Sequence, residues 1–151
     1  MRTAAGVLLI IAAVFNLMGS VGYIVGGGVA SNMENIASYA EKQNGKTLSA
    51  EDKANIAAAQ EKVGNSGIGL LAFGVFLLVS VGILIAGAVF LFKNTKPQFI
   101  MIAGGMAIVA EVIGILITNF GITNIVGLVA GILAIISAKS MGVGSAPEPV
   151  E

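Results

Sequence analysis

Residues 67–92 read GIGLLAFGVFLLVSVGILIAGAVFLF, a stretch without a single charged side chain. A helix rises about 1.5 Å per residue, so roughly 20 apolar residues are enough to cross the hydrocarbon core of a bilayer. This stretch is longer than that minimum, which leaves room for tilt or for projection beyond the membrane. It therefore predicts a transmembrane helix and places the chain among integral membrane proteins.

The composition of the whole chain supports this prediction and narrows the function. Of the 151 residues, 56% are hydrophobic and only 11% are charged, whereas a soluble domain carries about 25% charged residues. The absence of His and Cys excludes Cys/His zinc sites, Cys-ligated iron–sulfur clusters and Ser-His-Asp triads. Eight basic residues balance eight acidic ones, which argues against a nucleic-acid partner. We expect no enzymatic activity, no cofactor and no metal site.

Four apolar segments are long enough to be membrane spans, at about residues 4–25, 67–92, 99–119 and 121–138. A cleaved signal peptide is the alternative for the first segment, because small residues follow it at positions 28–31. Its apolar run is longer than the 7–15 residues of such signals, which favours a retained span. We predict an all-α membrane domain over residues 1–140, built as a four-helix bundle. A disordered C-terminal tail is expected over 141–151.

A polar segment at residues 31–66 separates the first two spans and predicts an inserted helical hairpin. Ser31 and Glu34 have the spacing of a capping box at the start of a helix, and Asn44-Gly45 is a typical helix stop. Ser49 and Asp52 repeat the capping spacing before a second helix. Glycines at positions 64 and 67 are expected to end that helix before the membrane. The run Gly26-Gly27-Gly28 is interpreted as a flexible exit from the first span.

The orientation in the membrane rests on the basic residues. Arg2, Lys93, Lys96 and Lys139 are expected on one side, and the four lysines of the hairpin on the other, so the count is tied. Charges in short connections next to span ends have the greatest influence, and Lys93 and Lys96 lie in a short connection without acids. We therefore expect both termini in the cytoplasm and the hairpin outside.

A polar layer is predicted inside the bundle. Glu111 is the only acidic residue within the four spans, and a charged side chain at mid-membrane costs about 2.5–3.5 kcal/mol on insertion scales. It shares a helical face with Gly104, Ala107, Gly114 and Thr118, whereas large apolar residues occupy the opposite face, so we expect it to point into the bundle.

Asn16 is central in the first span and is expected at a similar depth, where its amide can hydrogen-bond with Glu111. Ser80 is central in the second span and completes the predicted cluster, with Thr118 two turns away. This cluster is either structural or an ion or proton site, because a buried carboxyl group can hold a proton or release it to bind a cation.

Small residues predict where the helices approach one another most closely. Gly22 and Gly26 in the first span, and Gly127 and Gly131 in the fourth, have the GxxxG spacing that lets two helix backbones come close. Packing within the chain is favoured over a dedicated dimer interface, because small residues line membrane helix contacts widely. The expected packing positions are Gly22, Gly26, Gly104, Gly114, Gly127 and Gly131.

The order of these features resembles small uncharacterised bacterial tetraspan membrane proteins. The resemblance is carried by Arg2-Thr3, the turn from Lys93 to Pro97, the glycines after Ala103, and Gly127 to Gly131. It covers most of the chain. It implies a four-helix fold in a bacterial inner membrane and no particular activity.

The sequence leaves two functions open. The first is a non-enzymatic scaffold or accessory subunit of a membrane complex, with the hairpin as the surface that meets a membrane-protein partner or a second copy of the chain. The alternative is a small proton- or cation-coupled transporter or channel that uses Glu111. In both cases the lipid bilayer is the surrounding medium and the cell membrane is the expected location.

Overall fold

A computed structural model describes residues 1–45, 47–117 and 120–143, with the backbone alone at 34, 40, 44, 59–65 and 143. Every regular element in these residues is a helix. The helices are α1 (Arg2–Ser31), α2 (Met33–Asn44), α3 (Ala50–Lys93), α4 (Pro97–Ile117) and α5 (Ile122–Val143). Four of them contain stretches long and apolar enough to span a membrane. The all-α, four-span fold expected from the sequence is confirmed, and the chain is a multi-pass membrane protein.

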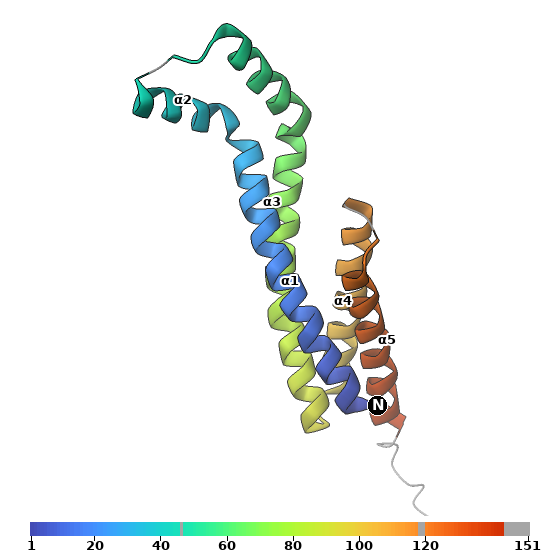
Figure 1. Cartoon of the computed structure of the whole chain (residues 1–151). Helices are drawn as coiled ribbons and strands as arrows, with labels where there is room; N and C mark the ends of the chain where they lie inside the picture. Colours follow the sequence, from blue (N-terminus) through green and yellow to red (C-terminus); the bar gives the residue numbers. More distant parts are fainter. Residues whose placement is uncertain (46, 118–119, 144–151) are drawn as a thin grey trace, which may run out of the picture. The chain divides into compact units, whose positions relative to one another are not determined.

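The chain divides into two units, and the first comprises Met1–Met18 and Leu77–Glu151. In it the beginning of α1, the end of α3, and the whole of α4 and α5 form a four-helix bundle (Figure 1). Its buried core is built mainly of alanine and leucine. Such small side chains let helix backbones approach closely in a membrane. The members of this core include Ala5, Leu9, Ala12, Leu84, Ala88, Leu91, Ile100, Ala107, Ala130, Ala134 and Ala138.

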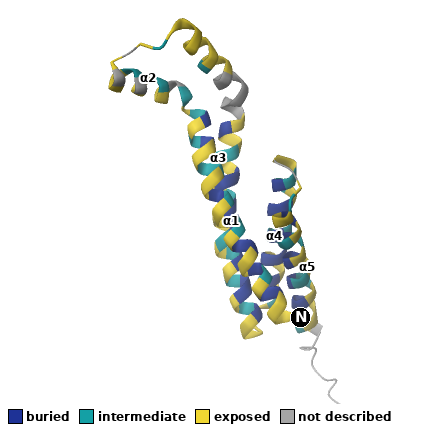
Figure 2. Ribbon diagram, viewed as in Figure 1, coloured by how far each residue is buried: buried dark blue, intermediate teal, exposed yellow. Residues whose placement is uncertain are grey.

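Large apolar side chains face outward, as the predicted helical faces require. On α4, Ala103, Ala107 and Glu111 are buried, whereas Val109 and Leu116 are exposed. Figure 2 shows the same division, with buried residues on the sides of the helices that face each other. An outward apolar surface is favourable only where lipid replaces water. The burial pattern thus agrees with four helices embedded in a bilayer.

The second unit, Gly19–Phe76, contains the end of α1, all of α2 and the beginning of α3. Here α1 and α3 pack through glycines and aromatic rings. A Cβ atom on Gly27 would lie 2.6 Å from the Gly67 carbonyl oxygen, so only glycine permits this approach. The rings of Tyr23 and Phe73 meet edge to face, with centroids 5.0 Å apart.

This packing corrects two expectations about helix ends. Gly26-Gly27-Gly28 is not a flexible exit, because α1 remains helical to Ser31. The second helix of the polar segment does not break at 64–67, because α3 is one helix from Ala50 to Lys93. In both places the close contact of Gly27 with Gly67 favours continuous helix over the conformational freedom that glycine otherwise offers.

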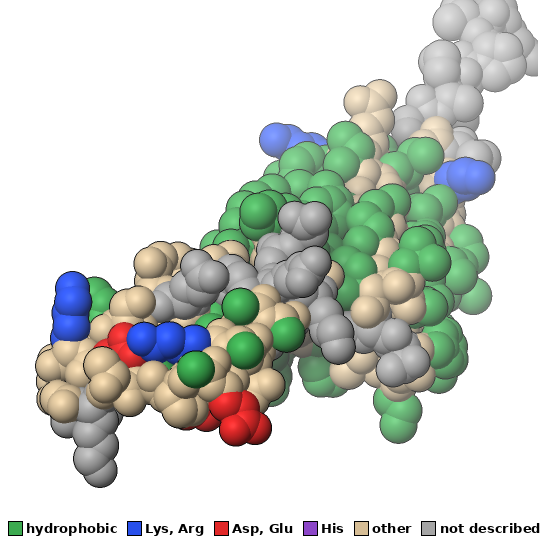
Figure 3. All heavy atoms as spheres, turned by 90° about the horizontal axis from the view of Figure 1, so that it is seen from above, with side chains coloured by type: hydrophobic (Ala, Val, Ile, Leu, Met, Phe, Trp, Pro, Cys, Tyr) green, Lys and Arg blue, Asp and Glu red, His purple; other side chains and the backbone are tan. Residues whose placement is uncertain are grey.

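The caps of the polar segment agree with the sequence at two of three positions. Gly45 ends α2 in the left-handed conformation, with φ of 62°. The Ser49 hydroxyl accepts a hydrogen bond from the Asp52 N–H at 3.1 Å at the start of α3. The predicted capping box at Ser31 is wrong. The Ser31 hydroxyl donates to the Gly27 carbonyl because α1 continues through this residue. Figure 3 shows acidic and basic side chains gathered on this segment.

The C-terminal boundary also differs from the prediction. The tail was expected to begin at residue 141, but α5 continues to Val143. The rest of the predicted tail, 144–151, lies outside the described residues.

Candidate functional site

The buried acid of the bundle is held between α4 and α5. Glu111 is 7% exposed and Asn124 is 8% exposed. The Asn124 side-chain amide donates a hydrogen bond to Glu111 Oε2 at 2.8 Å. A hydrogen bond of this kind compensates the carboxyl group for part of the hydration it loses on burial.

A helix cap orients Asn124 for this contact. Asn124 is the third residue of α5, and its Oδ1 accepts a hydrogen bond from the Gly121 N–H at 2.8 Å. A side chain that reaches back to the N-terminal cap in this way is one half of a capping box. Because the oxygen of the amide is engaged by the cap, the NH₂ group is the end that faces Glu111.

A glycine provides the space for the carboxyl group. A Cβ atom on Gly127 would lie 2.1 Å from Glu111 Oε1 and 2.5 Å from its Cδ. Any side chain at this position would therefore displace Glu111. Asn124 and Gly127 lie one helical turn apart on α5, so one face of this helix contributes both the donor and the space.

The predicted polar cluster is divided into two pairs. Asn16 donates to the Ser80 hydroxyl oxygen at 3.1 Å, and this hydroxyl donates to the Leu77 carbonyl at 2.7 Å. The structure thus brings Asn16 and Ser80 together, but it pairs Glu111 with Asn124 and not with Asn16. Thr118, the fourth predicted member, lies outside the described residues.

The division has a geometric cause. Asn124 belongs to the first turn of α5, and Glu111 lies six residues before the end of α4. The Glu111–Asn124 pair is therefore near the α4–α5 connection, whereas Asn16 lies at the middle of α1. The sequence predicts a span over 99–119 with Glu111 near its middle, and residues 118–119 lie outside the described residues, so the mid-depth position of Glu111 stays a prediction.

The predicted packing glycines fall into two groups. A Cβ atom on Gly104 would lie 2.7 Å from the Gly131 carbonyl oxygen, and one on Gly131 would lie 2.6 Å from the Gly104 oxygen. The backbones of α4 and α5 touch here, and the face also includes buried Gly114 and Gly127. In contrast, no described atom of another element lies within 4 Å of a Cβ on Gly22 or Gly26. On α1 the glycines that meet α3 are Gly27, at the Gly67 backbone, and Gly6, at the Phe92 ring.

Asn124 is the residue of this site that sequence reasoning missed. It lies inside the predicted fourth span but is not among the predicted cluster residues, although its spacing to Gly127, Gly131 and Ala134 puts it on the same helical stripe. The sequence signal for Asn124 is a polar amide at the start of a helical stripe that otherwise consists of small residues. Its partner was not predictable, because the distance between α4 and α5 depends on glycine contacts that a helical wheel does not represent.

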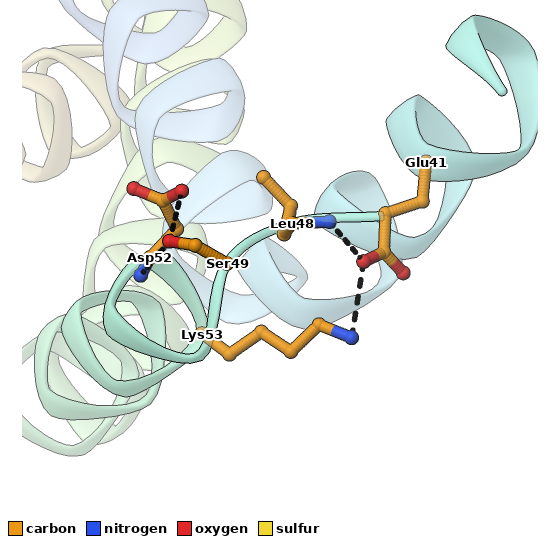
Figure 4. A network of polar contacts seen from close by, with 5 residues as sticks. All are labelled: Glu41, Leu48, Ser49, Asp52 and Lys53. Carbon is orange, nitrogen blue, oxygen red and sulfur yellow. Dashed lines mark hydrogen bonds and ion pairs between the residues drawn. The ribbon is translucent and has the colours of Figure 1, made fainter. Parts of the chain in front are cut away.

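A second polar network orders the segment between the spans (Figure 4). Glu41 on α2 accepts a hydrogen bond from the Leu48 N–H at 2.6 Å and pairs with Lys53 Nζ at 3.1 Å. These two contacts, with the backbone hydrogen bond as the larger cause, lower the pKa of the Glu41 carboxyl group. One carboxylate therefore joins α2, the connection and the start of α3.

We expect this junction to loosen in acid. A carboxyl group whose pKa is lowered by folding stabilises the folded form above its unfolded pKa, and this contribution disappears as the pH falls through the folded pKa. The Leu48 amide resonance in the solubilised full chain should thus titrate with a midpoint below the ordinary value of 4.5. The transition should vanish in Glu41→Gln and move upward, without vanishing, in Lys53→Met. A midpoint at or above the ordinary value would contradict the network.

Comparisons with known proteins do not assign the chain to a family. No family model matches the chain, and no curated protein or solved structure matches it. The fold and the polar pairs define a multi-pass helical membrane protein. Its function has to be argued from the described residues.

Proposed function

We propose that this protein is a non-enzymatic scaffold or accessory subunit of a membrane complex. The observation that carries the proposal is the engagement of Glu111 within the chain. One carboxylate oxygen accepts the Asn124 hydrogen bond, and the other occupies the space left by Gly127. A carboxyl group used in this way joins two helices, which is the structural use of buried polar groups in membranes.

The segment between the spans supports a partner-binding role. Between α2 and the start of α3 lies a groove of about 440 Å³, lined largely by apolar side chains. Ile36 is 48% exposed at this groove, next to Met33 and Leu48. The Glu41 network holds the two walls together, so the groove is formed before a partner arrives. The proposed partner is another membrane protein that inserts an apolar side chain here.

A pair of single substitutions tests this role. Ile36→Ser removes an apolar wall of the groove and should reduce the yield of a copurifying complex at least about tenfold, as expected for loss of an interface anchor. Tyr39→Ser is the matched control, because Tyr39 is 72% exposed on the same helix and does not line the groove. The measurement is quantitative mass spectrometry of crosslinked complexes from intact membranes. Equal losses in both variants, or no loss in either, would contradict a partner site at the groove.

Glu111 also favours a second candidate function, a small proton- or cation-coupled transporter or channel. Intramembrane acids commonly mark ion pathways. Among the described residues Glu111 hydrogen-bonds to a neutral amide and to no basic side chain, so no positive charge there holds the carboxyl group permanently as an ion. The two functions differ in their response to the loss of ionisation at Glu111.

We further propose that both termini and the α3–α4 connection face the cytoplasm of a bacterial cell, with the α2 segment outside. Support comes from Lys93 and Lys96, which flank the ends of two spans. The chain contains no Cys, so single cysteines can be introduced without background. In intact cells a membrane-impermeant maleimide should label Ser49→Cys and spare Thr95→Cys. The reverse labelling would invert the topology.

A further inference from the structure

At one end of the first unit lies a polar groove whose lining includes two basic residues. The groove holds about 520 Å³. It is lined by Arg2 of α1, by residues 94–96 of the α3–α4 connection with Pro97 at the start of α4, and by Ser140 and Met141 of α5. Figure 1 shows the N-terminus beside the end of α5. Residues from both ends of the described chain thus meet the short connection at one place.

Among the described residues, the charges at the groove are positive. Arg2 and Lys96 line it, and Lys93 and Lys139 lie next to its lining residues in the sequence. The only acid described in the first unit is Glu111. It lies near the other end of α4 and accepts the Asn124 hydrogen bond there. The basic groove therefore has no described carboxylate of its own unit beside it.

The backbone of the connection positions the polar groups. Asn94 and Lys96 both have positive φ angles, 53° and 51°, which are uncommon for residues with a side chain. The Asn94 side-chain oxygen accepts a hydrogen bond from the Arg2 guanidinium group. Lys96 Nζ lies 5.0 Å from the centre of the Phe90 ring, a cation–π distance. The two basic side chains are thus held in defined places.

We propose that this groove binds the phosphate group of an anionic membrane phospholipid. A guanidinium group has five N–H donors in a planar fork that suits phosphate oxygens, and Asn94 uses only part of this capacity. Lys96 adds a point charge, Thr95 adds a hydroxyl group, and α4 begins at Pro97, where the positive end of its helix dipole lies.

The position in the chain selects a lipid as the source of the phosphate. Arg2 is the first residue of one candidate span, Pro97 is the first residue of another, and Lys96 lies between two spans, so the groove lies where helices leave the hydrocarbon core. Met141 lines the groove, and Phe92 and Met101 are exposed close to the ends of the same spans. These side chains provide an apolar surface along which acyl chains can extend. Basic pockets of this kind are the sites where lipid headgroups bind.

The test compares two variants that lose the same charge. Arg2→Gln with Lys96→Gln alters the groove, whereas Lys93→Gln with Lys139→Gln removes two charges from residues that do not line it. Native mass spectrometry of the full chain in detergent measures binding of phosphatidylglycerol and of phosphatidylcholine with the same acyl chains. The parent should prefer phosphatidylglycerol. The groove variant should lose about 30-fold in phosphatidylglycerol affinity, which corresponds to about 1 kcal/mol for each basic residue.

The matched variant should lose less, no more than about threefold, because Lys93 and Lys139 are exposed and do not line the groove, so solvent screens their charges. Equal losses of affinity in the two variants would mean that binding depends on the overall positive charge and not on the groove, which would overturn the proposal. Displacement of phosphatidylglycerol by millimolar inorganic phosphate would assign the groove to a free anion and overturn the lipid as ligand. Gel filtration and circular dichroism establish that each variant is folded. A groove variant that fails to fold is replaced by Arg2→Lys with Lys96→Gln, for which the expected loss is at least about fivefold.

Discussion

Replacing Gly104 with alanine should lower the stability of the bundle by about 1–3 kcal/mol, the usual cost of inserting a methyl group into a fully packed contact. The new Cβ would lie 2.7 Å from the Gly131 carbonyl oxygen and 2.8 Å from Ile135 Cγ1. A backbone oxygen cannot rotate away as a side chain can. The helices α4 and α5 must therefore separate, and the separation also loosens the Glu111–Asn124 hydrogen bond two turns along.

The neighbouring glycine is the control for this prediction. No described atom outside the local helix lies within 4 Å of a Cβ on Gly105, so Gly105→Ala has the same change in helix propensity without the clash. It should be neutral or slightly stabilising, because alanine favours helix over glycine by about 0.5–1 kcal/mol. Thermal unfolding of both variants in one detergent measures the difference. If Gly104→Ala were as stable as Gly105→Ala, the close α4–α5 contact would be wrong.

The second large effect is expected at Glu111. Glu111→Gln keeps the shape of the side chain and an oxygen that accepts from Asn124, so the bundle should keep its thermal stability. Glu111→Leu leaves the Asn124 NH₂ group without this acceptor. Polar contacts between membrane helices are worth about 0.6–2 kcal/mol, so Leu should destabilise the bundle by that amount. Asn124→Ala should have a comparable effect, and the double variant with Glu111→Leu should cost less than the sum of the two.

Flux measurements on the same variants separate the two candidate functions. The parent, Glu111→Gln and Glu111→Leu are reconstituted in liposomes, and proton and Na⁺ flux are recorded. A scaffold should show no flux in any of them, together with the stability loss of the Leu variant. A transporter should lose coupled flux completely in a Gln variant of unchanged stability, because the exchangeable proton or cation-binding charge is gone. That second result would overturn the scaffold proposal.

Much of the architecture follows from local sequence alone. Charge-free stretches such as 67–92 had to become helices in lipid, because a backbone without water must satisfy its own hydrogen bonds. The faces of α1 and α4 were also predictable, since small and polar residues such as Asn16 and Gly104 recur at helical spacing opposite large apolar ones. The caps at Gly45 and Ser49 needed only neighbouring residues. Each of these features depends on interactions within a few turns of one helix.

Only the tertiary structure decided which polar groups meet. Glu111 pairs with Asn124 because the backbone contact between Gly104 and Gly131 sets the register of α4 against α5. Asn16 pairs with Ser80 through the separate packing of α1 against α3. The same kind of contact at Gly27 keeps α1 and α3 helical through glycines that would otherwise indicate helix ends. The basic groove brings together Arg2, Lys96 and Ser140, which lie far apart in the sequence. Such pairings depend on distances between helices, and these arise from contacts between residues far apart in the chain.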